Sequence, residues 1–237
     1  MKQRIYQHLA EHFKLPMENA HQPGTTIMQD EGRETSASQI IWTLDEHVIV
    51  RCNPQFARQF EAIIEAGEAL SLAKITDTLN VESGDEGNLY SITAADFIPH
   101  DCAYPIRQLT QDDAEAFANF HANCSEQDKE YGEVGLNDEV IFGALDGGRI
   151  IAAASTFEWY GFVDFGVLTD PDYRGQGAGK AVVAAITKHY LQNETDTRML
   201  IYRHDTSNIG SGKIATAIGW QRFAVLDFVR FKETASA

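Results

Sequence analysis

The chain is poor in cysteine and in positive charge. Its 237 residues include only Cys52, Cys102 and Cys124, an odd number without CxxC spacing. We therefore expect neither a disulfide framework nor a zinc site, and a reducing cytoplasm is the expected compartment. The 19 Lys and Arg are outnumbered by 35 Asp and Glu, for a formal net charge of −16. Because such a surface repels phosphate backbones and anionic membranes, neither nucleic acid nor a membrane is an expected partner.

The sequence also lacks a long hydrophobic run. No segment approaches the ~18 apolar residues of a membrane-spanning helix, and the first residues have no apolar export core. Hydrophobic residues still make up 43% of the chain, which is enough for one large core or two small ones. The histidines near the start show no ligand spacing, so no metal site is expected. These features predict a soluble globular protein.

Residues 1–100 predict a small α+β domain of unknown role. The expected elements are a helix over the first dozen residues that Pro16 ends, an exposed loop over residues 21–38, a hairpin over residues 39–52, a helix that begins at Asn53 and Pro54, and a break over residues 83–87. Pro99 interrupts the chain near residues 98–103, where we place the domain boundary.

Residues 101–237 predict a second α/β domain built around a mixed sheet. The expected elements are a strand over residues 104–109, a helix capped by residues 110–113, a hairpin around Gly147 and Gly148, a strand over residues 162–168, a helix from Ala178, a strand over residues 199–203 and a helix near Asn208.

The most informative segment joins the strand over residues 162–168 to the helix that follows it. Gly175, Gly177 and Gly179 lie at this junction. The first turn of a helix leaves about four backbone N–H groups unpaired, and glycines let a phosphate approach them. A dinucleotide fingerprint would need glycine at Lys180, and a Walker A loop would need four residues between its glycines and Ser or Thr at Ala181. The junction therefore predicts a phosphorylated ligand, but neither nucleotide motif fits.

The pattern Arg174-x-x-Gly177-x-Gly179 resembles the acyl-CoA pyrophosphate loop of the GNAT superfamily of N-acetyltransferases. The run from Pro171 to Gly175, the pair Asn208 and Ser211, and the ending Gly219 and Trp220 follow in the order that this family has. The resemblance covers residues 104–231, and the layout with a leading domain is similar to that of zwittermicin-resistance-type acetyltransferases. It implies a GNAT-like acyl-CoA N-acyltransferase fold, acetyl-CoA as the acyl donor co-substrate, and no metal.

The resemblance also implies which residues bind acyl-CoA. The strand over residues 166–169 is expected to separate from the strand over residues 199–203, so that backbone amides of Val167 and Leu168 polarise the thioester. The implied set is Val167, Leu168, Thr169, Arg174, Gly175, Gln176, Gly177, Ala178, Gly179, Lys180, Asn208 and Ser211. Arg174 could equally brace the turn, and Asn208 and Ser211 are residue types that cap helices anyway.

Acyl transfer from a thioester to an amine needs a neutral amine, a donor to the carbonyl oxygen and a proton for the leaving thiolate. Asp164, which interrupts an apolar strand, is the first choice for the base, and Glu158 is the second. Either carboxylate could instead lie on a solvated strand edge. Many family members use a tyrosine as the acid, but its position is Ala215 here. Ser211, His204, Tyr202 or water could serve instead.

The sequence thus predicts an acetyl-CoA-dependent N-acetyltransferase. We expect it to move the acetyl group to a primary amine of a small molecule or peptide by direct attack in a ternary complex. Cys124 is expected to be a buried small residue rather than an acyl-carrying nucleophile. The alternative is an acyl-CoA-binding sensor or partner-binding module without turnover. The acceptor cannot be identified from the sequence, and a homodimer is compatible with it.

Overall fold

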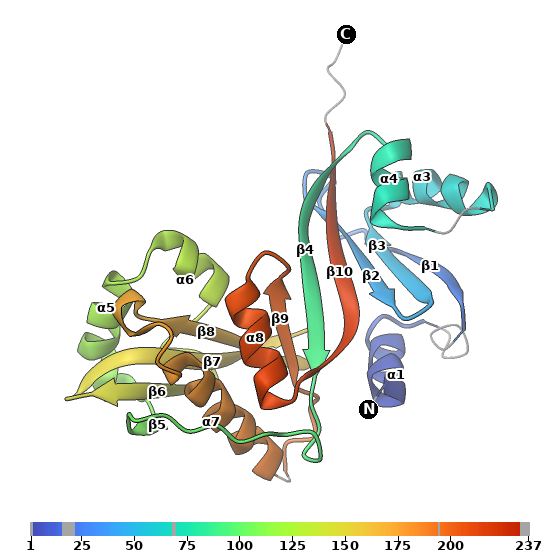
Figure 1. Cartoon of the computed structure of the whole chain (residues 1–237). Coiled ribbons are helices and arrows are strands. Elements are labelled where there is room, and N and C mark those ends of the chain that lie inside the picture. Colours follow the sequence, from blue (N-terminus) through green and yellow to red (C-terminus); the bar gives the residue numbers. More distant parts are fainter. Residues whose placement is uncertain (1, 16–21, 68–69, 194, 233–237) are drawn as a thin grey trace. The chain divides into compact units, whose positions relative to one another are not determined.

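A computed structural model describes residues 2–15, 22–67, 70–193 and 195–232 (Figure 1). The chain forms two compact units. The first contains residues up to Leu89 together with residues 205–207 and the chain from Phe223 onward, and the second contains residues 90–204 and 208–222. The chain therefore passes from one unit to the other within strands β4 (Val81–Ser91), β9 (Ile201–Asp205) and β10 (Gln221–Phe231). The predicted assignment of domains to residues 1–100 and 101–237 stays a prediction.

The first unit is a sheet with helices. Its further elements are α1 (Lys2–His12), β1 (Gly24–Gln29), β2 (Gln39–Leu44), β3 (His47–Cys52), α3 (Pro54–Glu65) and α4 (Leu72–Thr78). The strands follow the order β1-β3-β2-β10-β4, in which β1 is parallel to β3 and β2 is antiparallel to both of its neighbours. Phe56 and Phe60 of α3 pack with Ile41 and Val50 of the sheet in one hydrophobic cluster.

Several predictions for the first unit are confirmed. The first helix and the hairpin over residues 39–52 are present, and Pro16 lies outside the described residues. Asn53 caps α3, because its side-chain oxygen accepts a hydrogen bond from the Gln55 N–H at 3.0 Å.

Two predictions for the first unit are wrong. Within residues 21–38, of which residue 21 lies outside the described part, the exposed loop is interrupted by β1, which gains its pairing from β3 some twenty residues later. Residues 83–87 do not break the pattern, since β4 runs through them. Gly84 serves close packing there, because an added Cβ would lie 2.9 Å from the carbonyl oxygen of Phe228.

The second unit contains a four-stranded antiparallel sheet in the order β5-β6-β7-β8. Its strands are β5 (Ile106–Gln108), β6 (Val140–Asp146), β7 (Arg149–Trp159) and β8 (Phe162–Thr169). Its helices are α5 (Ala114–Ala122), α6 (Glu126–Gly132), α7 (Ala178–Gln192) and α8 (Ile209–Ile218), with 3-10 turns η1 (Gln111–Asp113) and η2 (Pro171–Tyr173). The predicted mixed α/β class and the elements expected in this half are confirmed.

Helices cover both faces of this sheet (Figure 1). On one face, Val182 and Ile186 of α7 pack with Phe165 and Val163 of β8. On the other face, Phe120 of α5 and Cys124 pack with Leu168 of β8. Odd and even positions of β8 therefore serve different cores, as the two-residue period of a strand requires.

Candidate functional site

Strands β8 and β9 meet at one point and then separate. Val163 and Leu200 form an isolated parallel bridge, and the Val163 N–H donates to the carbonyl of Met199 at 3.0 Å. Beyond this bridge β8 pairs only with β7 among the described strands. The opening predicted between these strands is therefore present, and it leaves one backbone edge of β8 without a strand partner.

The direction of the β8 amides follows from two hydrogen bonds. The Val163 N–H points toward Met199, whereas the Asp170 N–H donates to Ile151 of β7 at 2.9 Å. Because N–H directions alternate along a strand, Val167 directs its N–H to the open edge and Leu168 directs its N–H toward β7. Of the two predicted thioester donors, this geometry favours Val167.

The glycine loop, residues 174–180, follows β8 after the short turn η2. Asp170 is buried there, and its carboxylate accepts hydrogen bonds from the side chains of Arg149 at 2.6 Å and Asn123 at 3.3 Å. Its second oxygen accepts from the Asp172 N–H at 3.1 Å and caps η2. Asn123, which caps the end of α5, and Arg149 of β7 therefore hold the chain in place just before the loop.

The N-terminus of α7 has no side-chain cap. Its capping position is Gly177, in the left-handed region at φ 83°, and Gly175 has φ 76°. Added Cβ atoms at these two positions would meet nothing within 4 Å, so the space beside the loop is open. Among the described residues, the N–H groups from Gly175 to Lys180 have no hydrogen-bond acceptor. This arrangement suits an anion, since several N–H groups and the positive end of the helix dipole meet there.

The side chains of the loop are engaged with protein. Arg174 forms an ion pair with Asp128 of α6 at 2.7 Å, as the bracing alternative anticipated. The Gln176 side chain accepts from the Tyr104 hydroxyl at 2.6 Å and donates to the Asp172 carbonyl. Lys180 is half-buried. Backbone groups, rather than these side chains, therefore provide the anion-binding capacity of the loop.

Asn208 and Ser211 lie at the start of α8. The Asn208 side chain caps this helix by accepting from the Ser211 N–H at 3.1 Å. The Ser211 hydroxyl is 2.7 Å from the hydroxyl of the buried Tyr202, and burial raises the pKa of that tyrosine. His204 stacks on Tyr90 at a centroid distance of 5.4 Å. Two of the candidate acids, Ser211 and Tyr202, are therefore linked to each other.

The two predicted bases have opposite surroundings. Asp164 is fully buried, and its carboxylate accepts from Nε of Arg203 at 2.6 Å and from the Phe165 N–H at 2.8 Å. Burial raises the pKa of Asp164, and the Arg203 charge opposes that change. Glu158, near the end of β7, is exposed. Neither geometry decides the role, so both assignments stay predictions.

Sequence reasoning missed the partners of Asp164. Arg203 of β9 also donates to the carboxylate of Glu133 at 2.9 Å, and its guanidinium carbon lies 4.7 Å from the centroid of the Trp159 ring. Glu133 directly follows α6. Arg203 was part of the predicted strand over residues 199–203, but its contacts with Asp164 and Glu133 depend on how the strands and helices are arranged and could not be predicted from the sequence.

Cys124 is buried, and burial raises the pKa of its thiol to about 11. The thiol therefore stays protonated near neutral pH, which agrees with the predicted packing role. The described residues contain no group of three or more His, Cys, Asp or Glu side chains that could hold a metal ion. Within the same residues, no helix has the length and apolar character needed to cross a membrane.

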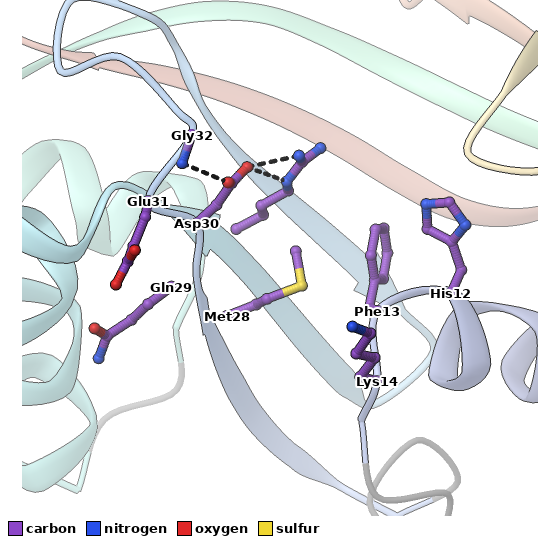
Figure 2. Close-up of a pocket in the computed structure, with 9 residues that line it drawn as sticks. His12, Phe13, Lys14, Met28, Gln29, Asp30, Glu31 and Gly32 are labelled. Carbon is purple, nitrogen blue, oxygen red and sulfur yellow. Dashed lines mark hydrogen bonds and ion pairs between the residues drawn. The ribbon is translucent and has the colours of Figure 1, made fainter.

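A separate pocket of about 390 Å³ lies within the first unit (Figure 2). It is lined by His12, Phe13, Lys14, Met28, Gln29, Asp30, Glu31, Gly32 and Arg51. The Asp30 carboxylate accepts from the Gly32 N–H at 3.0 Å and from Nε of Arg51 at 2.9 Å, and Figure 2 marks the contact between Asp30 and Gly32 with a dashed line. None of the predicted site residues lies in this pocket.

The described residues thus place a helix N-terminus without a side-chain cap next to a strand edge without a strand partner. Residues 104–219 match the acetyltransferase (GNAT) family, so this segment is a GNAT acetyltransferase domain. The predicted resemblance is confirmed. The zwittermicin-type subtype stays a prediction, and no curated protein matches the sequence significantly.

Solved structures show the same fold. The GCN5-related N-acetyltransferase from Kribbella flavida is similar with a TM-score of 0.56 and 15% identity, over 99% of this chain and 96% of that one. An acetyltransferase of the GNAT family from Colwellia psychrerythraea has a TM-score of 0.52 and 19% identity, over 77% of this chain and 76% of that one. At these identities the likeness concerns the fold alone.

Proposed function

We propose that this chain is an acetyl-CoA-dependent N-acetyltransferase that transfers the acetyl group to a primary amine of a small molecule or peptide. The single observation that carries the proposal is the row of N–H groups from Gly175 to Lys180 that have no acceptor among the described residues, next to open space and at the junction between η2 and α7. These groups would bind the diphosphate of acetyl-CoA, and Thr169, Asn208 and Ser211 border the same region in the family pattern.

The open edge of β8 would hold the acyl end of the donor. There the Val167 N–H is directed away from β7 and would donate to the thioester oxygen as it gains negative charge. The amine nitrogen forms a bond to the carbonyl carbon, the carbon–sulfur bond breaks, and the thiolate leaves with the electron pair. Ser211, linked to Tyr202, is proposed to return a proton to the thiolate, with water as the alternative.

We propose that the acceptor amine attacks the thioester carbon directly, without a covalent acyl-enzyme intermediate. A covalent acyl-enzyme would need a reactive nucleophile, and the Cys124 thiol is buried with a raised pKa. Initial-rate kinetics with both substrates varied would give intersecting double-reciprocal lines. Parallel lines would contradict direct attack.

The function is tested by following thiol release from acetyl-CoA with a panel of primary amines. Release that depends on one class of amine is the expected result. Tight binding of acetyl-CoA without thiol release across the panel would contradict an enzyme and support the alternative, a sensor or partner-binding module. The absence of acetyl-CoA binding would contradict both.

A further inference from the structure

Gly166 of β8 and Arg203 of β9 border the opening between these two strands. Gly166 lies three residues beyond Val163 on β8, and Arg203 lies three residues beyond Leu200 on β9. The end of α6 lies directly against this part of β8, because an added Cβ at Gly166 would collide with the carbonyl oxygens of Gly132 and Glu133. Glu133 is therefore adjacent to the strand segment where the proposed thioester would lie.

Charges around this opening do not balance. The Asp164 carboxylate is buried and closed by Arg203 and a backbone N–H. Arg203 contacts Glu133 through one oxygen, Oε2, whereas Oε1 of Glu133 has no partner among the described residues. The Glu133 side chain is 53% exposed, against 1% for Asp164. One negative charge therefore remains available to a ligand, and it belongs to Glu133.

Glu133 has a backbone conformation that is unfavourable for a residue with a side chain. It ends α6 in the left-handed region, at φ 45° and ψ 45°, a position that glycine favours. A side chain there costs about 1 kcal/mol or more relative to glycine. The Glu133 carboxylate lies against Arg203, and glycine at this position would relax the backbone but remove the charge.

We propose that Glu133 binds the protonated amine of the acceptor and accepts its proton. This inference rests on the proposed acetyl transfer. The ammonium gives one proton to the Glu133 carboxylate, and the freed lone pair attacks the thioester carbon. After the thiolate has left, the amide nitrogen loses its second proton to water, and Glu133 returns its own proton to solvent.

The same geometry defines the class of acceptor. Arg203, the cation at this opening, is already paired with Asp164 and Glu133, so an acceptor carboxylate finds no free cation from this network. A carboxylate next to the reacting amine would also be repelled by Glu133. The acceptors expected are primary alkylamines without a carboxylate near the reacting nitrogen, and α-amino acids are expected to react poorly.

The inference is tested with Glu133→Gln, with Glu133→Gly, and with Glu130→Gln as the matched control on the exposed part of the same helix. Loss of a general base typically lowers the rate by 10²–10⁴-fold, so we expect kcat/KM for alkylamines to fall by about 10²-fold in both Glu133 variants. The acidic limb of the pH profile of kcat/KM should shift or disappear, and the Kd for acetyl-CoA should not change. Glu130→Gln should match the wild type.

Glu133→Gly separates this role from folding, because its midpoint of urea unfolding should equal or exceed that of the wild type. Unchanged kcat/KM and an unchanged pH profile in Glu133→Gln, with an active wild type, would overturn this inference alone. A wild type that prefers α-amino acids to alkylamines would also overturn it. A wild type that releases no thiol with any amine would overturn the proposed function together with this inference.

Discussion

The guanidinium of Arg174 in the glycine loop lies 2.7 Å from the carboxylate of Asp128 in α6. Both side chains are partly exposed, at 52% and 29%. The diphosphate of acetyl-CoA would therefore compete with Asp128 for the same cation. The ion pair also links the loop to the helix that ends at Gly132, next to Glu133.

Asp128→Asn is expected to strengthen acetyl-CoA binding by about two- to five-fold, because exposed ion pairs contribute about 0.2–1 kcal/mol. Arg174→Gln is expected to weaken binding by a similar factor. Isothermal titration calorimetry at fixed salt measures both changes. Weaker binding by Asp128→Asn would mean that Asp128 positions Arg174 for the ligand instead of competing with it.

Asp164→Asn is expected to lower the free energy of unfolding by about 3–5 kcal/mol, since it leaves the charge of Arg203 without its buried partner. Urea unfolding measures the loss. Glu158→Gln, which changes an exposed carboxylate on the neighbouring strand, should stay within about 0.5 kcal/mol of the wild type. If Asp164→Asn were as stable as Glu158→Gln, the buried ion pair between Asp164 of β8 and Arg203 of β9 would not contribute to stability.

Ser211→Ala is expected to cost about 1–3 kcal/mol, because it leaves the buried Tyr202 hydroxyl without its recorded partner. Tyr202→Phe removes the buried hydroxyl itself and should cost less. If Ser211 returns the proton to the thiolate, kcat should also fall by about 10²-fold in Ser211→Ala. Thermal unfolding and initial rates separate the two effects, and an unchanged kcat would exclude Ser211 as the acid.

Asp227 of β10 predicts a pH dependence of stability. The residue is 5% exposed, its Oδ1 has no hydrogen-bond partner among the described residues, and burial raises its pKa from 3.8 to about 6. The folded state therefore binds more protons than the unfolded state between these values. The stability that Asp227 contributes to the folded state is therefore fully present below pH 3.8. As the pH rises through about 6, this contribution of about 3 kcal/mol to the free energy of unfolding is lost.

Asp227→Asn should abolish this change. The variant should therefore gain stability relative to the wild type between pH 4.5 and pH 7.5, by about 2 kcal/mol in urea unfolding, because about 1 kcal/mol of the change lies below pH 4.5. Asp101→Asn, at an exposed carboxylate, is the control and should show no such gain. Equal differences between Asp227→Asn and the wild type at both pH values would contradict the assignment.

Local patterns were enough to predict the parts of the site that are close in sequence. The strand, the glycine loop and α7 follow one another along the chain, so spacing alone predicted them. Glu133, Asp164 and Arg203 lie 31 to 70 residues apart, and only the topology brings them together. The edge strand β1 was missed for the same reason, because its pairing with β3 is parallel and not local.

The central claim is that backbone N–H groups of the glycine loop bind the diphosphate of acetyl-CoA. Gly177→Glu places a carboxylate in the open space beside them, and Gly67→Glu is its matched control. Gly67 lies in the first unit at φ 77°, close to the 83° of Gly177, and its added Cβ would also meet nothing within 4 Å. The two variants therefore carry similar backbone strain and the same added charge.

The most direct test measures the Kd for acetyl-CoA by isothermal titration calorimetry in both variants, after circular dichroism has shown that both are folded. We predict that Gly177→Glu binds at least about 100-fold more weakly than the wild type, equivalent to about 2.7 kcal/mol, and that Gly67→Glu binds like the wild type. Wild-type affinity in a folded Gly177→Glu variant would contradict the account.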